Sequence, residues 1–291
     1  MSPDLPWELI SAIIGKVVDR STLLSLCSTT KAVYEEASRC LYCDLSDNLD
    51  GNAKRHIKRI QTIVSNPHLA SLVRSYTIES VASSWRYELG GSDLEREVES
   101  DAPSTVKERK LDPRSFLWDI LPQALNLMAN LEHLCFRELS GQPSADWLLP
   151  NVNFQLKKMD WGSHGEGEEM ATFLATQRRI EYLYLEEGPA CPLDLGACLT
   201  LRSLRGNLST FERFLPGRPE ITELDWVPSM GDPMLEVLLP ELHRITHFSI
   251  GGYFMRHKLM PLGGYFRDLV AMNIHHIYEA SVLKRRLIVR Y

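Results

Sequence analysis

The feature that most constrains the fold is a six-residue pattern, apolar-x-x-apolar-x-apolar, that returns many times along the chain. Successive copies begin about 20 to 25 residues apart over most of their range. The copies are VRSYTI (73–78), LEHLCF (131–136), LKKMDW (156–161), IEYLYL (180–185), LRSLRG (201–206), ITELDW (221–226), ITHFSI (245–250) and LVAMNI (269–274). In an extended chain, the fourth and sixth positions of each copy face one side, and the third and fifth positions face the other. We therefore expect one short strand in each copy.

The segments between these strands have helical spacing. Residues 168–175, 209–215 and 232–239 each place apolar side chains on one helical face. Several segments end in Leu-Pro, at 149–150, 215–216 and 239–240, and proline is expected to stop each helix there. One strand and one helix in each repeat predict a stacked, curved array with a parallel sheet.

The repeats resemble leucine-rich repeats, which implies a curved, open solenoid with the sheet on its concave side. One copy departs from the pattern, because Gly206 replaces its last apolar residue. The asparagine that this family places three positions after the last apolar residue is also absent. Those positions hold Leu139, His164, Gly188, Ser209, Ser229, Tyr253 and Ile277. The loops must therefore satisfy their backbone groups in another way.

The first forty residues predict three short helices. The first spans about residues 4–18, with Asp4 as a cap and Pro6 in its first turn. The second follows a cap within residues 19–21, and the third runs from Lys31 to about Tyr42. The apolar side chains of the first helix spread over roughly 220°, whereas a helix packed on one core needs a stripe of about 100° or somewhat more. This helix is therefore expected to contact a second neighbour.

The same residues resemble an F-box, a family that opens with L-P-x-E-[LI]. The matching positions are Leu5, Pro6, Glu8, Leu9, Ile13, Val17, Leu24, Leu26 and Lys31. The aromatic residue usual soon after that lysine is missing, since Val33 stands there with Tyr34 beside it. The resemblance implies docking on the Skp-type adaptor of a cullin–RING ubiquitin ligase. The implied contact residues are Leu5, Pro6, Leu9, Ile10, Ile13, Ile14, Leu24 and Leu26. The alternative is that the three helices only cap the repeats and bury these residues internally.

The resulting organisation is an α+β or α/β solenoid protein in three parts. Residues 1–47 form the F-box-like helices, residues 48–66 contain a linking helix at 53–65, and residues 67–291 form the leucine-rich-repeat-like array. The linking helix has an apolar face at Ile57, Ile60 and Val64, opposite a basic face that we interpret as solvated. Residues 88–114 are rich in charge, Gly, Ser and Pro, and are expected to be a flexible insertion.

The side chains that alternate with the apolar strand positions are the candidate substrate-binding residues. They are His133, Lys158, Asp160, Tyr182, Tyr184, Arg205, Glu223, Asp225 and His247. Tyrosine and arginine are favoured energetic anchors in protein interfaces. Trp161 and Trp226 occupy apolar positions and are expected in the core.

The remaining signals argue against other classes of function. No catalytic motif is found, and Cys40 and Cys43 lack the second ligand pair that a zinc site needs. We therefore expect no enzymatic activity, no cofactor and no metal. The net charge of −6 argues against nucleic-acid binding. No apolar run reaches the roughly 20 residues that cross a bilayer. Six scattered cysteines fit a reducing compartment, in the cytoplasm or nucleus. The expected function is substrate recognition in a Skp–cullin–F-box (SCF) ubiquitin ligase, and the alternative is a leucine-rich-repeat scaffold outside any ligase.

Overall fold

The structure of this protein is a computed structural model. It describes residues 5–45, 53–79, 113–137, 145, 148–162, 167–185, 196–228, 235–251, 264–275 and 286–290. The chain divides into two compact units, residues 1–133 with 151–154, and residues 134–150 with 155–291. Residues 88–112 of the expected flexible insertion lie outside the described residues.

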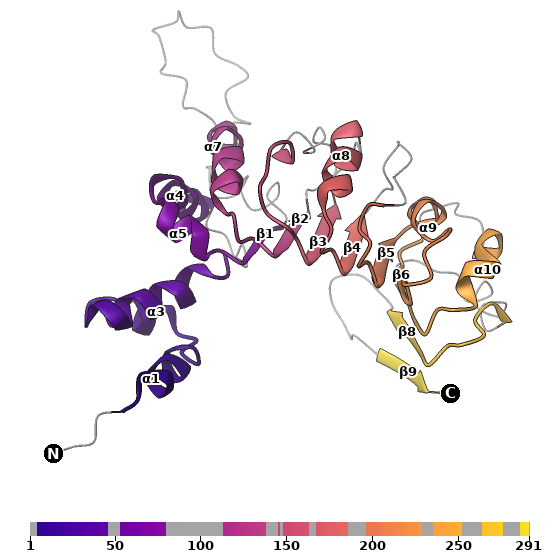
Figure 1. Cartoon of the computed structure of the whole chain (residues 1–291), viewed down its shortest axis with the longest axis horizontal. Helices are drawn as coiled ribbons and strands as arrows, with labels where there is room; N and C mark the ends of the chain where they lie inside the picture. The colour runs from indigo at the N-terminus through magenta and orange to yellow at the C-terminus, as the bar shows by residue number, and fades with distance from the viewer. Residues whose placement is uncertain are drawn as a thin grey trace, which may run out of the picture. The chain divides into compact units, whose positions relative to one another are not determined.

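Three short helices open the first unit: α1 (Trp7–Ile14), α2 (Arg20–Leu26) and α3 (Lys31–Tyr42) (Figure 1). The predicted cap of the second helix is present, because Asp19 accepts a hydrogen bond from the amide of Thr22. Thr30 caps the third helix and accepts a hydrogen bond from the amide of Val33. The first helix is shorter than predicted, since it ends before Gly15. The three helices share a small core formed by Ile14, Leu23, Ala37 and Leu41.

The rest of the first unit is built around α4 (Ala53–Ser65), α5 (Pro67–Leu72), β1 (Ser75–Glu79) and α7 (Pro113–Leu127). A helix is present at the predicted residues 53–65 as α4, and it packs against both α5 and α7. Ile57 and Ile60 are buried as expected, and Ile63 is buried as well. The residues that follow α3 pair with the start of β1: Asp44 forms a bridge with Ser75, and the carbonyl of Cys43 accepts hydrogen bonds from the amides of Arg74 and Ser75. The helices at the N-terminus therefore share a unit with β1.

The second unit is organised by a sheet whose strands follow the chain order. The strands are β2 (His133–Arg137), β3 (Lys158–Gly162), β4 (Tyr182–Leu185), β5 (Ser203–Gly206), β6 (Glu223–Trp226), β7 (His247–Gly251), β8 (Ala271–His275) and β9 (Arg286–Arg290). The predicted parallel sheet is confirmed from β3 to β8, where each strand pairs in parallel with the next. The last strand, β9, was not predicted and pairs antiparallel with β8.

The helices of the second unit lie on one side of these strands in Figure 1. They are α8 (Glu168–Thr176), α9 (Leu208–Phe214) and α10 (Leu239–Leu242), the last preceded by the 3-10 turn η2 (Leu235–Leu238). As expected, α9 ends just before Leu215-Pro216. The prediction is wrong at Leu239-Pro240, because Pro240 lies in the first turn of α10 instead of stopping a helix. The first turn of a helix tolerates proline, since its amide has no helical partner there.

The apolar positions of the strands face the helices and form the core. Trp161 and Trp226 are buried, as predicted. The departure at Gly206 has a steric reason: a Cβ atom there would lie 2.8 Å from the Cβ of Thr210 on α9. The helix approaches the sheet so closely at this point that only glycine fits.

Side chains from neighbouring repeats bond the backbone carbonyls of the turns that precede the strands. Thr200 donates to the carbonyls of Arg178 and Ile180, and Arg244 donates to those of Leu215 and Arg218. At the start of the strands, two consecutive amides share one carbonyl of the preceding repeat, as those of residues 222 and 223 do with residue 202. Each repeat is thus tied to the one before it.

Candidate protein-docking surfaces

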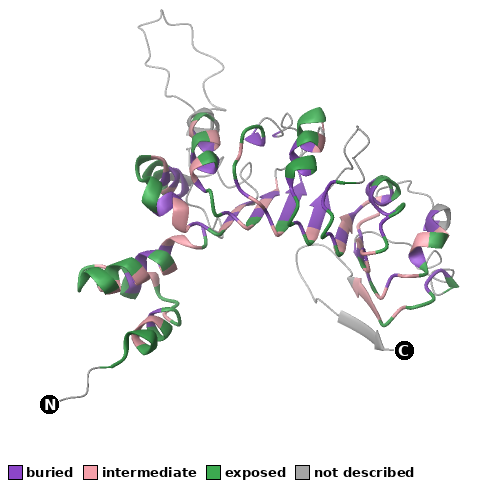
Figure 2. Cartoon of the chain, viewed as in Figure 1, coloured by how far each residue is buried: buried purple, intermediate pink, exposed green. Residues whose placement is uncertain are grey.

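The first candidate surface lies on the N-terminal helices, where α1 divides its apolar residues between two sides. Ile14 is only 3% exposed and packs in the core with Leu23, Ala37 and Leu41. Seven large apolar side chains of residues 5–45 are exposed: Val18 between α1 and α2, Tyr34 on α3, and five more that we call the N-terminal apolar surface. They are Leu5, Trp7, Leu9, Ile13 and Leu24. Figure 2 shows how much of these helices is exposed.

The structure changes the set of residues expected to contact an adaptor. Leu5, Pro6, Leu9, Ile13 and Leu24 are exposed, and Ile10 and Leu26 are half-buried. Ile14 is a correction, because it is buried inside the three-helix core and is not available to a partner. Trp7 was missed, although it occupies the variable position of the L-P-x-E-L motif.

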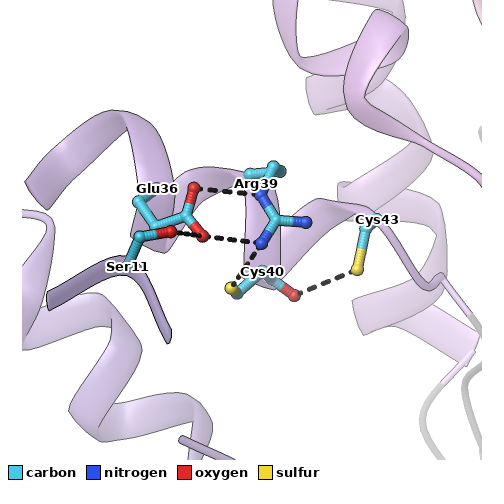
Figure 3. Close-up of polar contacts among 5 residues, drawn as sticks. All are labelled: Ser11, Glu36, Arg39, Cys40 and Cys43. Atoms are coloured by element: carbon cyan, nitrogen blue, oxygen red, sulfur yellow. Dashed lines mark hydrogen bonds and ion pairs between the residues drawn. The ribbon is translucent and has the colours of Figure 1, made fainter. Parts of the chain in front are cut away.

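A polar contact fixes α1 on α3. The hydroxyl of Ser11 donates to Glu36 Oε1 over 2.9 Å, and Arg39 donates to both carboxylate oxygens of Glu36, at 3.0 and 2.6 Å (Figure 3). The hydrogen bond from Arg39 lowers the pKa of Glu36. The ionised carboxylate of Glu36 therefore fixes the position of α1 on α3, next to the N-terminal apolar surface.

The two cysteines near the end of α3 have packing roles. The thiol of Cys43 donates to the carbonyl of Cys40 over 3.6 Å, and Arg39 lies 3.9 Å from the sulfur of Cys40 (Figure 3). Burial raises the pKa of Cys40, which disfavours a reactive thiolate. Within the described residues, no cluster of three or more His, Cys, Asp or Glu could hold a metal ion.

The second candidate surface is the strand face opposite the core. Two rows of side chains cross it in register. The outer row contains Lys158, Tyr182, Ser203, Glu223 and His247, and the inner row contains Asp160, Tyr184, Arg205, Asp225 and Ser249. Parallel pairing without a register shift therefore brings the predicted residues of β3 to β7 together.

The inner row is held by charged and aromatic contacts. Arg137 on β2 donates two hydrogen bonds to the carboxylate of Asp160, with Nε at 2.9 Å from Oδ1. The guanidinium carbons of Arg137 and Arg205 lie 5.8 and 4.6 Å from the centroid of the Tyr184 ring. Nε of Arg205 is 3.4 Å from Oδ2 of Asp225. The inner row thus forms a chain of two ion pairs with a tyrosine between the arginines.

Burial separates the predicted substrate-binding residues into two groups. Asp160 and Tyr184 are buried, which assigns them to the support of the surface instead of direct contact. Arg205, Asp225 and Tyr182 are half-buried, and burial raises the pKa of Tyr182. His133, Lys158, Glu223 and His247 are exposed. The sequence prediction missed Arg137, because this residue lies one position beyond the six-residue pattern. It nevertheless alternates with the apolar strand positions, as the other outward side chains do.

Comparisons with protein-family models and with curated proteins give no match to this chain. None of the helices in the described ranges has the length and apolar character needed to cross a bilayer.

Proposed function

We propose that this chain is a substrate-recognition adaptor of an SCF-type ubiquitin ligase. In this proposal, α1 to α3 form an F-box that docks on a Skp-type adaptor, and the strands form a leucine-rich-repeat-like solenoid that binds a protein substrate. The observation that carries the proposal is the exposure of Leu9 and Ile13, one helical turn apart on α1, beside a core already filled by Ile14.

The energetics favour a partner over solvent at this surface. Burying a large aliphatic side chain contributes about 1.5–3 kcal/mol. Leu9 and Ile13 lie four residues apart, so they face the same way and suit an apolar groove on another protein. The L-P-x-E-L motif resembles the start of an F-box, and with Leu5 and Pro6 exposed just before α1 it supports a Skp-type partner in this proposal.

The proposed role requires no chemistry from this chain. The docked helices would attach it to the cullin ligase core, and the strand surface would hold the substrate. A substrate lysine then reaches a charged ubiquitin carrier at a raised effective concentration.

The proposal is tested by co-purification of the full chain with a Skp-type adaptor. The double substitution Leu9→Asp with Ile13→Asp is expected to abolish co-purification and to leave the circular dichroism spectrum unchanged. The matched control is Leu199→Asp with Val270→Asp, which charges two apolar side chains equally exposed in the second unit. Retained binding by the first variant, or loss of binding by the control, contradicts the docking model.

The second candidate is a scaffold whose N-terminal helices only cap the strands. One observation favours it: Leu45 is buried after α3, and its amide donates to the carbonyl of Ser75 on β1. A fragment of residues 44–291 keeps this pairing and removes α1 to α3. A soluble fragment that unfolds cooperatively supports a separable docking module, whereas aggregation supports the cap.

A further inference from the structure

Two exposed charges of opposite sign stand in the outer row, three strands apart. Lys158 on β3 is in register with Tyr182, Tyr182 with Ser203, and Ser203 with Glu223 on β6. Lys158 and Glu223 are both exposed. Within the part of the chain that the structure describes, neither forms an ion pair. This row therefore presents a positive side chain on β3 and a negative side chain on β6 to a partner.

The inner row adds no net charge to the strand surface, so Lys158 and Glu223 determine its local charge. Arg137 is paired with Asp160, and Arg205 with Asp225, so the two ion pairs together add no net charge beneath the outer row. The ammonium of Lys158 lies 4.7 Å from the centroid of the Tyr182 ring, a contact that positions it over β4. The sign of the charge in the outer row is consequently set by Lys158 at β3 and by Glu223 at β6.

The separation of the two charges defines a length of peptide. Neighbouring strands are about 4.8 Å apart, so three steps place Lys158 and Glu223 about 14 Å apart at their backbones. An extended chain advances about 3.3 Å per residue. A segment crossing the strands would therefore span this distance with about four residues.

We propose that the strand surface binds an extended segment of a partner protein that carries one acidic and one basic side chain about four residues apart. The acidic side chain contacts Lys158, the basic one contacts Glu223, and the residues between them cross Tyr182 and Ser203. This inference rests on the proposed function, because it names the class of substrate that the strand surface selects.

The charge balance argues against a nucleic acid as the occupant. A phosphate backbone requires a stripe of positive side chains, whereas the outer row contains the acidic Glu223 and the chain carries a net charge of −6. A segment with one acidic and one basic side chain complements Lys158 and Glu223. Such charge complementarity mainly provides specificity and fixes the register of the bound segment.

The test is selection from a displayed library of random twelve-residue peptides against the full chain. We expect wild-type protein to enrich peptides with an acidic and a basic residue about four positions apart. Lys158→Glu should enrich peptides with two basic residues at that spacing, and Glu223→Lys peptides with two acidic residues. Enrichment of peptides with one sign of charge by wild-type protein, or no enrichment, would overturn the proposal.

A second measurement uses the best wild-type peptide in a fluorescence anisotropy titration at low salt. Lys158→Glu is expected to weaken binding at least about threefold, and replacing the acidic residue of the peptide by lysine should restore it. The matched control is Glu212→Lys, an exposed reversal on α9 that should leave affinity unchanged. An equal loss in the control, or no rescue by the changed peptide, also contradicts the inference.

Failure of this inference is distinguishable from failure of the ligase proposal. Lys158→Glu and Glu223→Lys should keep co-purification with the Skp-type adaptor. The variant Leu9→Asp with Ile13→Asp should keep peptide binding and lose the adaptor. Each surface is thus tested with the other intact.

Discussion

Ile13 and Ile14 are neighbours in α1, yet 59% of Ile13 is exposed and only 3% of Ile14 is. A helix turns by about 100° per residue, so two consecutive side chains face different directions. Ile14 joins Leu23 and Leu41 in the core, while Ile13 remains outside with Leu9. This division explains why the apolar stripe of the helix is wider than one core requires.

The first prediction separates these two isoleucines by stability. Ile14→Ala should lower the free energy of unfolding of the three-helix region by about 2–4 kcal/mol, because it leaves a cavity in a small core. Ile13→Ala should change it by less than about 0.5 kcal/mol, as is usual for surface substitutions. Native-state hydrogen exchange of amides in α1 to α3 measures both effects. Equal losses would show that Ile13 also packs internally.

The sequence predicted the helix and an apolar stripe too wide for one core, but not which isoleucine faces that core. Ile10, Ile13 and Ile14 are chemically equivalent, and only packing against α2 and α3 assigns them to the two sides. The length of the helix was overestimated, because the apolar pattern continues through Val17 although the helix ends before Gly15.

The second prediction concerns the close approach of α9 to β5. Gly206→Ala should destabilise the protein by about 1–3 kcal/mol, since its new methyl group would overlap the side chain of Thr210. Gly251→Ala at the end of β7 is the matched control, because a Cβ atom there meets nothing within 4 Å. Urea unfolding of the two variants provides the comparison. A neutral Gly206→Ala would mean that α9 moves freely away from the sheet.

The strands were predictable because the alternation of apolar and polar positions repeats at a nearly constant spacing. All eight pattern copies became strands, from β1 to β8. The last strand, β9, lies outside the pattern and pairs in the opposite direction, so no repeat signal could reveal it. The burial of Asp160 and Tyr184 was also missed, because it depends on arginines from neighbouring strands.

The third prediction measures the ion pair that supports the inner row. Arg137→Met leaves the buried carboxylate of Asp160 without its main partner, and should cost about 1–3 kcal/mol of stability. The lower part of this range is expected, because Arg137 is partly exposed. Arg137→Met with Asp160→Asn should recover part of the loss, since no uncompensated charge remains. A double-mutant cycle with Asp160→Asn gives the coupling energy, and additive losses would contradict a direct interaction.

The fourth prediction concerns alkaline pH and rests on Cys198. Burial raises the pKa of this thiol from 9.0 to about 12, and its sulfur donates to the carbonyl of Leu174 over 3.6 Å. Above pH 9 the unfolded chain loses this proton while the folded chain keeps it. Stability from this group is therefore fully present below pH 9 and is lost as the pH rises toward 12.

The measurement is urea unfolding of wild-type protein and of Cys198→Ala between pH 7 and 11. Cys198→Ala should be less stable than wild type at pH 7, because it removes a buried side chain, but its stability should fall less steeply above pH 9. Alkylation provides a second readout: Cys198 should react with iodoacetamide only after unfolding, and later than the half-buried Cys27 and Cys135. Parallel pH profiles for the two proteins would show that Cys198 does not carry the alkaline loss, and early alkylation would show that the loop at the start of β5 opens in the folded state.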